Sequence, residues 1–111
     1  MSKANHRSEL LFATFVIIVV LGFPFAAFGE DAATTFKAKC AMCHGADASG
    51  NTAMGKKFNI PDLRAPETQK KSKAELATVI AKGKNKMPAF EGKVSADEVG
   101  ELATYVRQLK K

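Results

Sequence analysis

Two cysteines and a histidine lie within five consecutive residues, "CAMCH", which runs from Cys40 to His44. The chain has no other cysteine, and its second histidine is His6. Two thiols three positions apart with an imidazole directly behind them serve three kinds of chemistry: a redox disulfide, a metal site or a covalently attached haem. Each of these needs a different fold around it, so this segment constrains the chain more than any other.

The first 29 residues have the pattern of an export signal. A basic start is followed by the apolar run "LLFATFVIIVVLGF" and by the small-x-small sequence "AFG", which predicts cleavage before Glu30. The alternative is that residues 10–28 stay in place as an uncleaved membrane anchor, although Pro24 would interrupt such a helix. In either case we expect residues 30–111 to form one exported, periplasmic domain.

That domain is small and basic. Its 82 residues are close to the lower limit for an independent hydrophobic core, and domains of this size usually recruit a disulfide, a metal or a cofactor. Without Lys3, Arg7 and Glu9 of the signal, 15 of the chain's 17 basic residues and 10 of its 11 acidic residues remain. Scattered lysines favour acidic partners, whereas two arginines without interleaved aromatic residues argue against nucleic-acid binding.

Helical signals punctuate the domain. Asp31 is a suitable N-cap for a helix through "AATTFKAKCAM". Ser72 and Glu75 form a capping box for "SKAELATVIAKG", which ends at Gly83. Ser95 and Glu98 repeat the capping box before the last helix.

The last helix has apolar residues at helical spacing, namely Val99, Leu102, Val106 and Leu109. The segments between the helices, residues 45–71 and 84–94, have the composition of loops. No segment has the alternating pattern of a strand, so the predicted class is all-α with long loops.

The helical context selects among the three chemistries. A Cys-x-x-Cys disulfide closes a very short loop and would therefore restrain little of the unfolded chain. A thioredoxin-like site needs a βαβ unit around the motif, and no strand is predicted here. A structural zinc needs four protein ligands, but only Cys40, Cys43 and His44 remain once His6 is lost with the signal. A c-type haem fits, because Cys40 and Cys43 can reach two vinyl groups and His44 can then bind the iron.

A second axial ligand decides what such a haem does. A second histidine is absent from residues 30–111, and Met42 lies within the motif itself. Met54 and Met87 remain, and the context favours Met87, which follows a well-capped helix in a loop stiffened by Pro88. A methionine here can also simply pack in the core.

These motifs together resemble the small monohaem class I c-type cytochromes of bacteria, of the c6 and c553 kind. The resemblance rests on "CAMCH", on "KMPAF" (residues 86–90) and on the final amphipathic helix. It implies a cytochrome c fold: three to five short helices around one covalently bound haem c, with the N- and C-terminal helices crossing.

The resemblance also implies contacts of individual residues. Phe36 would pack against Tyr105 and Leu102 where the two terminal helices cross. Pro61 and Leu63, with Phe90, would contribute to the haem wall, and the carbonyl of Pro61 would accept a hydrogen bond from the Nδ1–H of His44.

The function implied is a single-electron carrier rather than an enzyme, because a His/Met-ligated iron has no open position for a substrate. We expect a monomer whose redox partners have acidic docking surfaces. They would meet a basic rim around the haem edge, formed by Lys37, Lys39, Lys56, Lys57, Lys84 and Lys86. Three alternatives remain: a membrane-tethered electron-entry subunit of a larger redox complex, a five-coordinate haem protein that binds small ligands, and a haem-free metal or thiol module.

Overall fold

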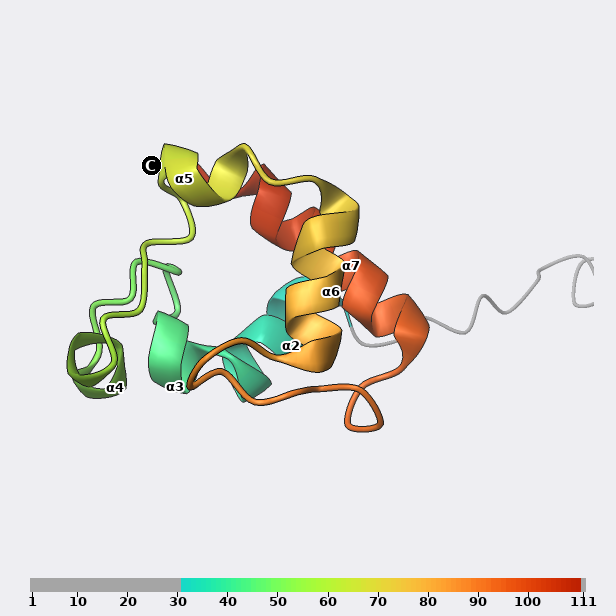
Figure 1. The fold of residues 1–111 in the computed structure, drawn as a ribbon, viewed down its shortest axis with the longest axis horizontal. Coiled ribbons are helices and arrows are strands. Elements are labelled where there is room, and N and C mark those ends of the chain that lie inside the picture. Colours follow the sequence, from blue (N-terminus) through green and yellow to red (C-terminus); the bar gives the residue numbers. More distant parts are fainter. Residues whose placement is uncertain (1–30, 111) are drawn as a thin grey trace, which may run out of the picture.

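The computed structural model describes residues 31–110 (Figure 1). This part of the chain consists of helices joined by turns and loops, and it contains no β-strand. The predicted signal, its cleavage site and Glu30 lie outside the described residues. Among residues 31–110, no helix has the length and apolar character needed to cross a membrane. The described chain is therefore all-α, as the sequence predicts.

The first helices carry the cysteine motif. Helix α2 (Ala32–Lys39) begins at Asp31, whose carboxylate accepts a hydrogen bond from the backbone N–H of Thr34 at 2.8 Å. The predicted single helix through Met42 is instead broken at Cys40, where φ is −117°, and resumes as the four-residue helix α3 (Ala41–His44). The backbone N–H of His44 donates to the carbonyl of Cys40 at 3.0 Å, so the motif still occupies one helical turn.

The two later helices begin where the capping boxes predict. In α6 (Lys73–Lys82) and in α7 (Ala96–Gln108), the N-cap serine accepts from the N3 backbone, and the N3 glutamate accepts from the N-cap backbone. Each box satisfies two N–H groups that have no partner within the helix. The predicted starts at Ser72 and Ser95 are confirmed.

Residues 45–71 differ from the predicted loop, because they contain α4 (Ala53–Lys57) and α5 (Pro66–Gln69). Both are too short to show an apolar period. The start of each helix is instead set by its first residues. At the start of α4, the Thr52 hydroxyl accepts a hydrogen bond from the Gly55 N–H at 2.8 Å. In α5, Pro66 occupies the first helical position.

Helix α7 is the centre of the packing, since both α2 and α6 contact it (Figure 1). Phe36 of α2 is 2% exposed and forms a core cluster with Leu102 of α7. The ring centroids of Phe36 and Tyr105 are 5.4 Å apart, with the planes tilted by 49°. The expected contact of the two terminal helices through these residues is confirmed.

Candidate functional site

An apolar cavity opens between the helices and the loop of residues 83–94. Its empty volume is about 590 Å³, which includes space open to solvent. The apolar lining comes from Phe36, Leu63, Leu76, Val79, Ile80, Phe90, Val94, Leu102 and Val106. Among the described residues that line it, Lys39, Cys40, His44 and Met87 have a nitrogen or sulfur atom in the side chain. The cavity therefore brings the cysteine motif and "KMPAF" together across more than forty residues of sequence.

One side of the cavity is formed by the start of the motif. Cys40 and Cys43 are half-buried free thiols, and Cys40 contributes to the lining whereas Cys43 does not. Burial raises the pKa of the Cys40 thiol. The ring of His44 lies with its centroid 6.2 Å from that of Phe36, and burial lowers the pKa of its imidazole. The neutral imidazole that metal ligation requires is therefore favoured.

The expected partner of His44 is not found. Its Nδ1 atom is buried and has no hydrogen-bond partner among the described residues. Pro61 is exposed and does not line the cavity. Its predicted hydrogen bond to His44 is absent, whereas its predicted place in the haem wall stays a prediction. The carbonyls of Ile60 and Pro61 instead lie over Gly50, where an added Cβ would be 2.7 Å and 3.5 Å from the two oxygens.

The other side of the cavity is formed by a tight turn that contains Met87. The N–H of Lys84 donates to the carbonyl of Met87 at 3.1 Å, and the N–H of Met87 donates to the carbonyl of Lys84 at 2.9 Å. Asn85 takes the left-handed conformation that this turn requires, with φ of 53°. Gly83, with φ of 77°, lets the chain turn back so closely that an added Cβ would lie 2.6 Å from the carbonyl oxygen of Met87.

The other candidate residues are divided between the cavity and its surroundings. Leu63 and Phe90 line the cavity, and their place in a haem wall stays a prediction. Met54 is half-buried and outside the lining, and Met42 is 79% exposed. Of the apolar lining, sequence reasoning named only Leu63 and Phe90 as wall residues, so it missed Val79 and Val94 among others. Val79 could have been found from the apolar stripe of its helix, whereas Val94 stands alone in a loop.

The six lysines of the predicted rim are exposed: Lys37, Lys39, Lys56, Lys57, Lys84 and Lys86. Lys39 also contributes to the cavity lining, so its side chain lies at the edge of the opening. Lys84 and Lys86 belong to the turn that contains Met87. Positive charge therefore lies beside the cavity on both the cysteine-motif side and the Met87 side.

The residues of this cavity fit a covalently attached haem. The apolar walls suit a porphyrin, the thiols of the motif are free, and the imidazole and the thioether are soft donors that iron accepts. The Nδ1 atom of His44 is buried and has no hydrogen-bond partner among the described residues. A buried polar atom without a partner is rare in folded proteins and points to a ligand that is not part of the chain.

Comparisons with known proteins agree with this fit. Residues 27–106 match the family described as "Cytochrome C oxidase, cbb3-type, subunit III". A cytochrome c6 of Rippkaea orientalis is 38% identical over 101 residues, which cover 88% of this chain and 87% of that protein.

Two further comparisons extend the match. The solved structure of the c-type cytochrome KustC0563 is similar with a TM-score of 0.66 at 30% identity, covering 74% of this chain and 100% of that one. The cbb3-type cytochrome c oxidase subunit CcoP of Azospirillum brasilense is 33% identical over 86 residues, which are 76% of this chain and 29% of that subunit. The similarity to CcoP thus concerns one part of a longer protein.

Proposed function

Since this chain belongs to the small class I c-type cytochromes and carries covalently bound haem c, we propose that it is an exported single-electron carrier with His/Met-ligated iron. In this proposal Cys40 and Cys43 attach the haem. His44 and Met87 would be the two ligands of the haem iron. One observation carries it: Met87 lines the same apolar cavity as Cys40 and His44, although it lies more than forty residues further along the chain.

The chain's own residues support each part of this role. When bound, the haem supplies a reversible one-electron couple. The lowered pKa of His44 keeps its imidazole neutral and able to donate a lone pair. The turn at residues 84–87 holds the backbone of Met87 by two hydrogen bonds. The apolar walls exclude water, and a thioether ligand favours a high reduction potential.

The ligand set is tested by the ferric absorption spectrum of the haem-loaded protein. A methionine-ligated ferric haem has a weak band near the red end of the visible spectrum, and we expect Met87→Ala to abolish it. Met54→Ala is the matched control and should leave the band unchanged, because Met54 does not line the cavity. A wild-type protein without the band, or a band lost with Met54 instead, would contradict the assignment of Met87.

The basic rim supports acidic redox partners. We expect the second-order rate of electron exchange with an acidic partner to fall as salt is raised, because screening weakens charge steering. Lys39→Gln should reduce the rate at low salt, since Lys39 lies at the edge of the cavity. Lys73→Gln, an exposed lysine that does not line the cavity, is the control. Equal effects of both variants would mean that net charge alone matters.

A second function is favoured by the matches to the cbb3-type family and to CcoP. In this alternative the domain is a membrane-tethered electron-entry subunit, and residues 10–28 are its anchor. Mass spectrometry of the protein from its native host distinguishes the two. An N-terminus at Glu30 supports the exported carrier, whereas an intact Met1 in the membrane fraction supports the tethered subunit.

A further inference from the structure

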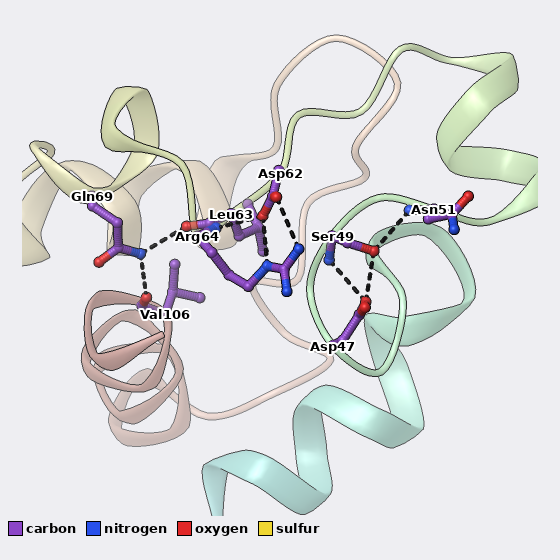
Figure 2. A network of polar contacts seen from close by, with 8 residues as sticks. All are labelled: Asp47, Ser49, Asn51, Asp62, Leu63, Arg64, Gln69 and Val106. Carbon is purple, nitrogen blue, oxygen red and sulfur yellow. Dashed lines mark hydrogen bonds and ion pairs between the residues drawn. The ribbon is translucent and has the colours of Figure 1, made fainter. Parts of the chain in front are cut away.

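The side chain of Gln69, the last residue of α5, joins two parts of the cavity wall (Figure 2). Its Nε2 atom donates to the backbone carbonyl of Leu63 at 2.7 Å and to that of Val106 at 2.8 Å. Leu63 and Val106 both line the cavity, one from the segment before α5 and the other from α7. Both hydrogens of one half-buried amide group are thus used to hold two wall residues in a fixed relation.

The backbone of Leu63 is held on its other side as well. Its N–H donates to the carbonyl of Ala48, a fully buried residue of the cluster around Phe36, at 2.9 Å. The neighbouring side chains of Asp62 and Arg64 form two hydrogen bonds of 2.9 Å and 3.0 Å with each other, as Figure 2 shows. Gln69 supplies the link from this segment to α7. Without it, the carbonyl of Leu63 would lose the hydrogen bond that ties this wall residue to the C-terminal helix.

We propose that Gln69 is a positioning residue for electron transfer, which keeps Leu63 against the haem and water away from that side of it. This inference rests on the proposed function, because it requires the haem to occupy this cavity. Solvent exposure is one of the determinants of a haem's reduction potential. Water favours the ferric iron, which carries the larger net charge, so a loosened wall lowers the potential.

A purely structural role for Gln69 makes a different prediction. If the amide only ties α5 to α7, its loss lowers stability and leaves the haem environment unchanged. The reduction potential therefore separates the two roles, whereas thermal stability alone does not.

The main test compares Gln69→Leu with the wild-type haem-loaded protein, because leucine removes both donors at similar size without adding charge. We expect the ferric/ferrous equilibrium to shift about threefold to tenfold toward ferric, since solvent exposure is a principal control of haem potentials. Hydrogen exchange at the amide of Leu63 should accelerate, and the red band of the ferric state should be kept. The potential is measured by a spectroscopic redox titration.

Two control variants accompany it. Gln108→Leu removes an exposed glutamine of α7, and Ser95→Ala removes the N-cap of α7 at a cost of about 1 kcal/mol. Both should keep the wild-type potential. A Gln69→Leu protein that loses stability as Ser95→Ala does, but keeps its potential, overturns the proposal. A red band already absent from the wild type counts against the ligand assignment, and the potential of Gln69→Leu still decides the role of Gln69.

Gln69→Glu gives an independent test, because the protonation state of the new carboxyl group decides whether it can donate a hydrogen bond to the carbonyls of Leu63 and Val106. At neutral pH the introduced carboxylate cannot donate to either carbonyl, and once protonated it can donate one hydrogen bond. The difference in potential from the wild type should therefore shrink as the pH falls below about 4. Gln108→Glu makes the same charge change at an exposed site and should not reproduce this effect. A difference from wild type that is independent of pH, or equal in both variants, contradicts the positioning role.

Discussion

The two sides of the cavity are built in different ways. On one side, Cys40, Cys43 and His44 lie on a single helical turn, and adjacency in the sequence is enough to bring them together. On the other side, Met87 lies outside any helix, and its place depends on the backbone of Gly83 and on the turn that follows it. Attachment of the haem is therefore a local property of the chain, whereas the proposed sixth ligand depends on long-range backbone geometry. Substitutions should be able to disturb one side without the other.

The largest effect is expected on the cysteine side. The double variant Cys40→Ala/Cys43→Ala removes both thiols that can bond to haem, so the protein should carry none after denaturing electrophoresis and haem staining. Met87→Ala should keep full staining, because thioether bonds do not depend on the sixth ligand. Loss of staining in Met87→Ala would mean that the two sides are not independent.

The next largest effect is expected on the stability of the protein, when Phe36, which connects the cysteine side to α7, is replaced. Phe36 is 2% exposed, and the centroid of its ring is 6.2 Å from that of His44 and 5.4 Å from that of Tyr105. Phe36→Ala should lower the free energy of unfolding of the haem-loaded protein by about 3–5 kcal/mol, because it leaves a cavity in the core. Guanidinium chloride unfolding measures this change.

Phe58→Ala is the matched control, since Phe58 is only half-buried and lies near the exposed Lys57. We expect a clearly smaller loss of unfolding free energy for this variant. Equal losses for the two phenylalanines would show that the contact between α2 and α7 contributes no more than a peripheral ring does.

A smaller effect tests the Met87 side alone. Gly83→Ala places a Cβ 2.6 Å from the carbonyl oxygen of Met87 and 2.9 Å from the N atom of Ala89, at a φ of 77°. Relief of this overlap must move the turn, so we expect a weakened red band in the ferric spectrum and a loss of about 1–3 kcal/mol of stability.

Gly92→Ala separates the overlap from the backbone strain. Gly92 has a similar φ of 83°, but an added Cβ would meet no atom within 4 Å. It should cost only the strain of a left-handed alanine, about 1–2 kcal/mol, and leave the red band at full strength. If both variants weaken the band equally, the close approach of Gly83 to Met87 is not what holds the ligand.

The same contrast explains what the sequence can predict. The cysteine motif, the capping boxes and the apolar stripe of α7 act over a few residues. The capping boxes and the stripe are found where local rules place them, whereas the helix predicted through the motif is broken at Cys40. The contact of Phe36 with Tyr105 and Leu102 is also as expected, although it rests on the family resemblance, because no local signal pairs two helices.

Residues 45–71 could not be predicted in this way. Helices of four and five residues have no apolar period, and α4 depends on Thr52, whose hydroxyl also donates to the carbonyl of Cys43 at 2.7 Å. The carbonyl of Ile60 closely approaches Gly50, and the bridge made by Gln69 joins segments that are distant in sequence. Such contacts exist only in the folded chain, so composition and spacing do not reveal them.

The smallest effect concerns the two capping boxes, which lie outside the cavity lining and should leave both of its sides undisturbed. Hydrogen bonds from the N-cap serines lower the pKa of Glu75 and of Glu98 below the ordinary value. A lowered pKa in the folded state means that the carboxylates stabilise the fold above the ordinary pKa, and that this contribution is lost as the pH falls through the folded-state pKa. Thermal stability should therefore decrease below about pH 4, where glutamate begins to protonate.

The double variant Glu75→Gln/Glu98→Gln keeps an acceptor at both N3 positions but cannot titrate. Its thermal midpoint should fall less steeply than that of the wild type between about pH 5 and pH 3. Asp31 and Asp47, whose pKa values are also lowered by hydrogen bonds, remain in both proteins and supply the acid sensitivity that is left. Identical acid profiles would assign the pH dependence to those aspartates and none of it to the capping boxes. The red band should stay unchanged in the double variant at neutral pH, because neither box contributes a residue to the cavity lining.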